Sequence, residues 1–222
     1  AGYEITVYPT KAPLDGYQHI IDNEGKYDVI ACSGGDGTLN ETVAAILKYK
    51  GEKPPIGYIP SGTTNDFAAS LGIPRNMVKA AMNIAKGKLF PCDVGMMNGE
   101  RSFNYVAAFG AFTRVSYGTP QNLKNVLGHQ AYVIEAVKSL STIKPQYMRV
   151  YSDEMNVEGN FVYGMISNTD SVGGIKNLTG NDVDLQDGLF EVTLIRELNN
   201  PIAVQSLINA FITKDLSKCD WV

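Results

Sequence analysis

Residues 27–42 contain, in unbroken order, an apolar run, a glycine loop and the start of a helical pattern. The run from Tyr27 to Cys32 predicts a buried parallel strand, whereas helical spacing begins at Leu39. The loop between them, residues 34–38, reads Gly-Gly-Asp-Gly-Thr. Glycines let the backbone approach a ligand closely, and the free amides of a helix start favour an anion. This stretch predicts a phosphate site, although a tight turn with Asp36 as a surface cap would have the same sequence.

A second loop of the same kind follows the next strand-like run. Residues 56–59 predict a strand, and residues 60–68 (PSGTTNDFA) combine glycine, hydroxyls and an acid before a helical segment. In a parallel sheet the carboxyl ends of neighbouring strands meet at one edge, where ligands bind. The two loops are therefore expected to line one crevice of an α/β fold. An acid at position 36 would repel bare phosphate, so it implies a bridging cation or a proton taken from a substrate hydroxyl.

The string GGDGTLNE, followed by IPSGTTNDFA and CDVG, resembles the diacylglycerol kinase catalytic-domain family, specifically its soluble bacterial lipid kinases. NAD kinases and phosphofructokinases carry loops similar to the first, whereas the pairing with SGTTNDFA is narrower. The resemblance continues through VSYGTPQNLKNVLGHQAYVIEAVKSL, SNTDSVGG and DVDLQDGLFEV. It implies an N-terminal doubly wound nucleotide-binding α/β domain of the NAD kinase/diacylglycerol kinase type, residues 1–92. A C-terminal β-sandwich domain with a helical insertion, residues 93–222, would bind the lipid substrate.

Charge and cysteine content argue against several other classes. The 222 residues carry 19 Lys and Arg against 23 Asp and Glu, a net charge of −4, and no stretch stands out as basic. This gives little support to nucleic-acid binding or to electrostatic docking on anionic lipid. Cys32, Cys92 and Cys219 lack CxxC spacing and indicate reduced, intracellular thiols. No apolar run reaches about 18 residues, so no membrane span is predicted and a cytoplasmic protein is expected.

Hydrophobic periodicity predicts the remaining elements. Alternation predicts strands over residues 3–8, 102–109, 147–151, 159–167 and 189–196. Helical spacing predicts helices over residues 15–24, 77–86, 123–141 and 201–212. Gly87 is expected to close the second of these helices, and Asn200 to cap the last. The late strands, with no further strand, glycine loop and helix units, favour an antiparallel sheet.

The resemblance implies that both loops bind ATP. The expected nucleotide-binding residues are Thr10, Gly34, Gly35, Asp36, Gly37, Thr38, Leu39, Asn40, Ser61, Gly62 and Thr63. From the residues alone, Thr10 is equally consistent with an ordinary turn. Asn40 is equally consistent with a plain helix cap.

Three acids are the expected catalytic residues: Asp36, Asp66 and Asp93. Asp66 lies in a first helical turn, where an acid can simply stabilise the helix dipole. Asp93 interrupts an apolar run that is expected to be a strand, where an acid is costly unless it is paired or hydrated, and a solvent-facing edge position is the alternative. The resemblance favours joining these acids in a water and metal network.

An acidic loop, residues 182–189 (DVDLQDGL), is the candidate metal site. It lacks the glutamate and spacing of an EF-hand, and Asp187-Gly188 before a strand also predicts a hairpin turn. The matching loop of related bacterial enzymes holds a structural magnesium. By that resemblance Asp187 is expected to bind Mg²⁺ through its side chain, and Asp184 and Leu189 through backbone oxygens.

The resemblance implies an ATP-dependent lipid kinase that phosphorylates diacylglycerol to phosphatidic acid with Mg²⁺. The partners are then ATP, diacylglycerol and, transiently, the membrane surface, and a homodimer is compatible with the family. Sphingoid-base, phosphatidylglycerol or NAD kinases, or a non-catalytic nucleotide- or lipid-binding regulator, remain alternatives. The family's opening Asn-Pro-Ser-Gly turn and closing acidic motif are absent, so we expect a portion of a longer chain. Because the family's general base lies in that acidic motif, no glutamate here, including Glu197, is assigned to the role.

Overall fold

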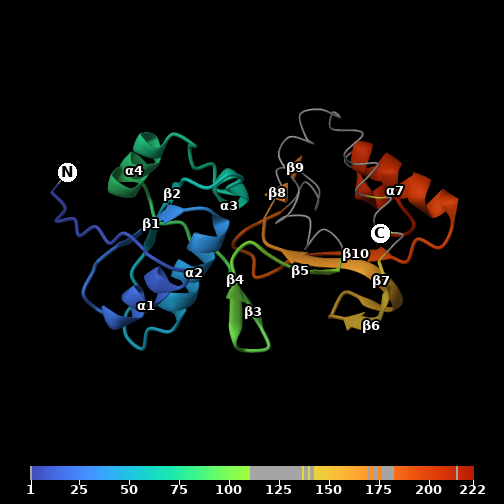
Figure 1. Cartoon of the computed structure of the whole chain (residues 1–222), viewed down its shortest axis with the longest axis horizontal. Coiled ribbons are helices and arrows are strands. Elements are labelled where there is room, and N and C mark those ends of the chain that lie inside the picture. Colours follow the sequence, from blue (N-terminus) through green and yellow to red (C-terminus); the bar gives the residue numbers. More distant parts are fainter. Residues whose placement is uncertain are drawn as a thin grey trace. The chain divides into compact units, whose positions relative to one another are not determined.

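The computed structural model describes residues 2–110, 137, 140, 143–169, 171–172, 175–176, 183–213 and 215–222. It divides into two compact units, and Figure 1 shows their elements. The first comprises Ala1–Tyr105 and Asp184–Leu189, and the second comprises Val106–Val183 and Phe190–Val222. This division falls at Tyr105 rather than at residue 92, and it assigns the acidic loop to the first unit.

The first unit is built from two parallel strands and four helices, as its two strand, loop and helix repeats predicted. The helices are α1 (Asp15–Asp22), α2 (Asp36–Leu47), α3 (Asp66–Ser70) and α4 (Met77–Lys86), and the strands are β1 (Ile30–Gly34) and β2 (Ile56–Pro60). β1 pairs with β2 in parallel, with Ile30 opposite Ile56. A short antiparallel pair, β3 (Gly95–Met97) and β4 (Arg101–Phe103), follows.

The apolar faces of the helices form two clusters around this sheet. Cys32 and Tyr58 of the strands pack with Leu39 of α2 and Phe67 of α3. Ile20 of α1 packs against the other part of α2. On α4, Ala80 is fully buried, and a Cβ atom on Gly57 of β2 would lie 2.6 Å from the Ile84 side chain. Gly57 therefore allows α4 to lie close to the sheet.

The second unit is organised around one long strand, β7 (Asn156–Ser167). β5 (Val106–Gly110), β6 (Gln146–Tyr151) and β10 (Glu191–Arg196) all pair with it in antiparallel fashion, which confirms the predicted antiparallel sheet. β8 (Ser171–Val172) and β9 (Ile175–Lys176) form a separate short pair. Helix α7 (Pro201–Thr213) packs its apolar side, including Leu207, on this core, and the 3-10 helix η1 (Leu216–Lys218) follows.

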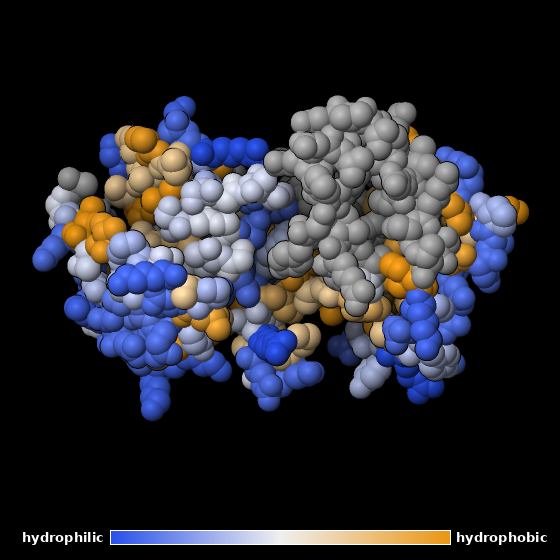
Figure 2. All heavy atoms as spheres, in the orientation of Figure 1, coloured by the Kyte–Doolittle hydropathy of each residue, from blue (hydrophilic) through white to orange (hydrophobic). Residues whose placement is uncertain are grey.

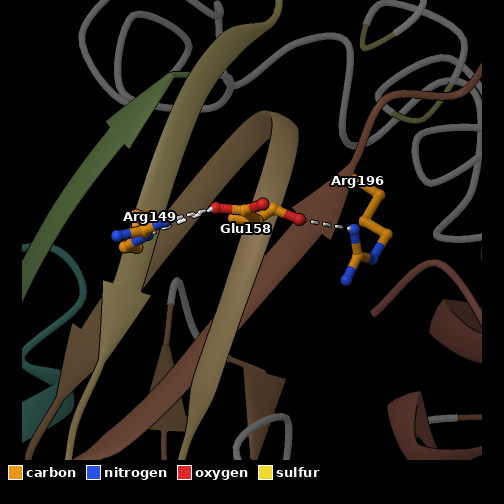
Figure 3. A network of polar contacts seen from close by, with 3 residues as sticks. All are labelled: Arg149, Glu158 and Arg196. Carbon is orange, nitrogen blue, oxygen red and sulfur yellow. Dashed lines mark hydrogen bonds and ion pairs between the residues drawn. The ribbon is translucent and has the colours of Figure 1, made fainter.

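Surface polar contacts fasten three strands of this sheet (Figure 3). The Arg149 guanidinium on β6 donates from Nη2 to the Glu158 carboxylate on β7 at 3.0 Å, and Arg196 on β10 donates to the Glu158 carbonyl at 3.4 Å. The Arg149 and Glu158 side chains are 69% and 54% exposed. A pair this exposed contributes at most about 1 kcal/mol, so it supports the strand register and does not define a site.

Three expectations about elements were wrong. Residues 3–8 form no strand: Ile5 and Val7 are 79% and 81% exposed, and no strand of the described chain pairs with them. The strand expected over residues 102–109 is broken into β4 and β5 by Asn104 and Tyr105. Asp93, expected inside a strand, lies in irregular chain before β3.

The helix boundaries were predicted more accurately. α4 spans residues 77–86 as expected, but Gly87 follows it with a φ of −74°, so it is not a left-handed cap. Asn200 caps α7, because its Oδ1 accepts the Ala203 amide at 2.8 Å. The helix expected over residues 123–141 lies outside the described chain except at Val137 and Leu140. No helix within the described residues is long and apolar enough to cross a membrane.

Candidate functional site

The two glycine loops are in direct contact within the first unit. Gly34 lies opposite Pro60 in the strand register, and the Ser61 amide donates to the Gly34 carbonyl at 2.9 Å. A Cβ atom on Gly62 would lie 2.5 Å from the Cα of Gly35, so this approach requires glycine at position 62. The structure thus brings the predicted loop residues together at one edge of the sheet.

The Asp36 carboxylate joins the first loop to the helix that follows the second. Asp36 begins α2, and its Oδ2 and Oδ1 accept hydrogen bonds from the amides of Asp66 and Phe67, both at 3.1 Å. These amides lie in the first turn of α3, where no helix carbonyl can pair with them. Asn65, at the N-cap position of α3, makes no side-chain cap bond. Asp36 therefore caps α3 from another helix.

Burial is the main influence on the protonation of Asp36. Desolvation raises the pKa of its carboxyl above the usual value of 3.8, the amides of Phe67 and Asp66 lower it, and the nearby Asp66 charge raises it. The net direction is upward. A bound cation would favour the ionised form of Asp36 and so oppose this shift.

Asp66 is buried beside a tyrosine that the sequence did not single out. Only 3% of Asp66 is exposed, and the Tyr105 hydroxyl donates to its Oδ2 at 2.6 Å. A hydrogen bond to a charged acceptor is short and strong, and it fixes the carboxylate orientation. Because the partners are far apart in the sequence, no local pattern identified Tyr105.

Replacing Tyr105 with phenylalanine should destabilise the first unit while keeping its packing. Removing one partner of a buried charged group costs about 1–3 kcal/mol, so we expect a loss of that size in the free energy of unfolding, measured with urea. Tyr147→Phe is the matched control, because Tyr147 is 70% exposed and its change should stay within about 0.5 kcal/mol. Equal stability of Tyr105→Phe and wild type would show that this hydroxyl does not hold Asp66.

Asn65 fixes the second loop, a role that sequence reasoning missed. Its Oδ1 accepts the Gly62 amide at 3.0 Å, and its Nδ2 donates to the Gly62 carbonyl at 2.7 Å. Asn65 has a φ of 56°, a left-handed conformation that asparagine tolerates better than most residues. An asparagine shortly after a glycine loop was the available signal, but a turn of this kind is not specific.

An open pocket of about 300 Å³ lies beside the second loop. Its lining includes the predicted Ser61, Gly62 and Thr63, together with Arg75, which the sequence had not indicated. Arg75 is the cation of this lining, and its guanidinium lies 3.5 Å from the Thr64 carbonyl. A pocket with loop amides, hydroxyls and an arginine is suited to a phosphate-bearing ligand.

The other expected nucleotide-binding residues lie in different settings. Gly37 and Thr38 are exposed in the first turn of α2, where amides lack helix partners. Leu39 is 3% exposed in the core, and its amide donates to the Gly35 carbonyl. Asn40 lies inside α2, so it is no N-cap, and its Oδ1 is buried without a partner in the described structure. Thr10 lies in the irregular exposed segment before α1.

Asp93 anchors the acidic loop to the first unit. Its amide donates to the Leu185 carbonyl at 2.8 Å, and its Oδ2 accepts the Gly188 amide at 2.7 Å. Gly188 has a φ of 78°, which explains the glycine of this turn. Asp93 is thus paired, as an acid in an apolar run requires.

The expected metal ligands belong to this anchored loop. Asp184 Oδ1 accepts the Gln186 amide at 3.0 Å, and Asp187 Oδ1 accepts the Leu189 amide at 2.9 Å. Within the described residues no group of three or more His, Cys, Asp or Glu side chains is placed to hold a metal. A site here would need backbone oxygens beside the carboxylates, which is the donor chemistry that Mg²⁺ accepts.

These features define an α/β protein in which two glycine loops meet at the ends of neighbouring parallel strands, the edge at which such folds bind ligands. Residues 1–97 match the model of the diacylglycerol kinase catalytic domain. The chain belongs to the diacylglycerol kinase catalytic domain family.

Individual relatives extend the similarity over most of the chain. Diacylglycerol kinase of Bacillus subtilis (strain 168) is 35% identical over 202 residues, which are 90% of this chain and 65% of that protein. Diacylglycerol kinase of Staphylococcus aureus (strain JH9) is 36% identical, with 90% and 62% covered. The chain therefore spans somewhat under two thirds of these relatives. A crystal structure of a diacylglycerol kinase from Bacillus anthracis str. Sterne superposes with a TM-score of 0.70 at 26% identity, covering 95% of this chain and 67% of that one.

Proposed function

We propose that this chain is the core of an ATP-dependent diacylglycerol kinase, which transfers the γ-phosphate of ATP to the free lipid hydroxyl and gives phosphatidic acid. The observation that carries the proposal is the contact between Gly35 and Gly62, because it forms one amide-lined edge from two loops. Phosphoryl transfer depends on positioning and charge neutralisation, for which such an edge is well suited. In this proposal the first unit, which contains residues 1–92, is the doubly wound nucleotide domain, and the second unit, which contains most of residues 93–222, is the lipid-binding β-sandwich of a cytoplasmic enzyme.

The loops and the first turn of α2 would hold the phosphates. Backbone amides of Gly34, Gly35, Gly37 and Thr38 face the phosphates in this arrangement, while Ser61, Gly62 and Thr63 contact the nucleotide from the second loop. Leu39 secures the start of α2, and Asn40 and Thr10 extend the contact set. Asn65 keeps the Gly62 amide in place through its two hydrogen bonds. Nucleotide binding therefore depends on backbone geometry more than on any one side chain.

The acids would manage charge around the phosphates. The donor chemistry fits Mg²⁺, since Asp36 and Asp66 are neighbouring carboxylates and the buried Asn40 Oδ1 lacks a partner in the described structure. When bound, Mg²⁺ supplies charge neutralisation to the phosphates. Asp36 and Asp66 would hold the catalytic ion, and Asp93 would connect them to the acidic loop. There Asp187, with backbone oxygens of Asp184 and Leu189, would hold a structural ion.

A radiolabel transfer assay tests the proposal. The purified full-length protein is incubated with γ-labelled ATP and one acceptor at a time: diacylglycerol, a sphingoid base, phosphatidylglycerol or NAD. We expect label in phosphatidic acid, lost on chelation of Mg²⁺. Label in NADP or in another phospholipid would identify a different acceptor and so contradict the proposal of diacylglycerol. Tight ATP binding without transfer to any acceptor would identify a non-catalytic regulator.

A further inference from the structure

The outer side of α4 is apolar, although α4 already buries another side against the sheet. Ala80 and Ile84 are on the inner side, whereas Val78 and Met82 are 70% and 50% exposed. At about 100° per residue, Val78, Ala81 and Met82 lie on one side of the helix. Figure 2 shows orange, hydrophobic spheres at the position of α4. This helix therefore presents two apolar sides, of which only one is covered in the described structure.

Apolar exposure continues just beyond the end of α4. Leu89 and Phe90 are 81% and 53% exposed, within four residues of Lys86, the last residue of α4. We call the exposed Val78, Ala81, Met82, Leu89 and Phe90 the α4 surface. Scattered single apolar residues need no explanation, whereas a contiguous exposed apolar patch marks an interaction site, and Val78, Ala81 and Met82 form such a patch on the outer side of α4.

The charges of this segment have one sign. Residues 67–92 contain four of the 19 Lys and Arg residues of the chain and none of its 23 Asp and Glu. All four cations, Arg75, Lys79, Lys86 and Lys88, are exposed. The segment is not strongly basic, and what distinguishes it in a chain of net charge −4 is the absence of acids.

We infer that the α4 surface is where the protein docks on an anionic lipid bilayer. The inference rests on the proposed function, because a substrate that resides in a membrane requires such contact. Apolar side chains of an interfacial helix enter the boundary between headgroups and acyl chains. Lysines beside them extend their ammonium groups to the anionic headgroups, which an acid-free segment does not oppose. Apolar area and charge complementarity thus point to the same partner.

Vesicle flotation tests the inference without relying on catalysis. Wild-type protein is mixed with vesicles of phosphatidylcholine alone or of phosphatidylcholine with phosphatidylglycerol. We expect binding to the anionic vesicles only, weakened by added salt. Val78→Ser with Met82→Gln should abolish flotation. Lys79→Gln with Lys86→Gln should lower the partition coefficient by about five-fold per lysine. Lys48→Gln with Lys50→Gln is the matched control, since both are exposed on another segment, and it should float like wild type.

Several outcomes would overturn the inference. Wild-type protein that floats with neither vesicle, or α4 variants that float as well as wild type, would do so. A maleimide-labelling arm examines Val78→Cys: the introduced thiol should react in the free protein and become protected by anionic vesicles. Lack of reaction before vesicles are added would show that another part of the protein covers this face, and so would contradict docking there.

Turnover separates this inference from the proposed function. With short-chain diacylglycerol dispersed as monomers, the Val78→Ser, Met82→Gln protein should match wild type, whereas with vesicle-embedded diacylglycerol it should lose about 10-fold or more. Equal loss on both substrates would show an effect on the active site and contradict docking. If wild-type protein phosphorylates neither form, the proposed function fails, while flotation still decides the docking surface.

Discussion

Replacing Gly62 with alanine should remove tight ATP binding and destabilise the first unit. The added methyl group would lie 2.5 Å from the Gly35 Cα and 2.8 Å from Asn65 Oδ1. The Gly35 Cα belongs to the backbone, and Asn65 Oδ1 holds the second loop through its bond to the Gly62 amide. The methyl group can therefore be accommodated only if the two loops separate. We expect the free energy of unfolding to fall by about 1–3 kcal/mol, the usual cost of overpacking. Turnover should fall by about 100-fold, since a displacement near 1 Å has that effect on a positioned site.

The matched control for this prediction lies in the other glycine loop. A Cβ atom on Gly37 would meet no heavy atom within 4 Å, and its φ is not positive. Gly37→Ala, in the first turn of α2, should therefore keep or slightly raise the stability. Urea unfolding of both variants provides the comparison of stability, and ATP calorimetry compares Gly62→Ala with wild type. If Gly62→Ala unfolds and binds ATP like wild type, the close approach of the loops has no importance for the site.

The convergence of the two loops could be predicted from the sequence because each step is local. Strand runs, glycine turns and helix starts are adjacent in the chain, and parallel strands bring their carboxyl ends to one edge. The contact between Gly35 and Gly62 follows from that topology. The same local reasoning correctly placed α4 and the Asn200 cap.

The hydrogen bonds that hold the site together could not be predicted in the same way. Asp36 bonds to Phe67, and Asp66 bonds to Tyr105, across 31 and 39 residues. An aspartate looks the same in a sequence whether it holds a cation or caps a distant helix. That Asp36 caps α3 is visible only in the three-dimensional structure. The Asn65 clamp depends on a backbone angle that no composition pattern fixes.

Alternation also overestimates strands where no neighbour is available. Residues 3–8 alternate as a strand would, but a strand is stable only when its amides and carbonyls pair with another chain segment. In the described structure Tyr8 instead stacks on His19 with ring centres 3.6 Å apart, and its hydroxyl donates to Asp15 at 2.8 Å. Of this segment, Tyr8 is thus held against α1 by its side chain.

Replacing Asp36 with asparagine should lower turnover by about 100-fold or more, the scale seen when one preorganised electrostatic contact is lost. In the wild-type protein the two carboxylate oxygens accept hydrogen bonds from the amides of Asp66 and Phe67. Asparagine has a single acceptor oxygen, so its NH₂ group would face one of these amides, and two donors would meet. The negative charge beside Asp66 would be lost as well. Asp28→Asn, an isosteric change at an exposed acid, is the control and should leave turnover unchanged.

The pH dependence gives the Asp36 prediction a second, independent test. Burial raises the pKa of Asp36 in the folded protein above the value of 3.8 that it has in the unfolded chain. At a pH between the unfolded and the folded pKa, the folded protein therefore binds more protons than the unfolded chain. The stability that wild type has over Asp36→Asn should therefore be largest at and below about pH 3.8 and decrease as the pH rises through the raised pKa. Urea unfolding of both proteins across the acidic range measures this difference. If the stability of wild type over Asp36→Asn instead grows with rising pH, the folded state favours ionised Asp36. The capping amides, and not burial, would then control the charge of this residue.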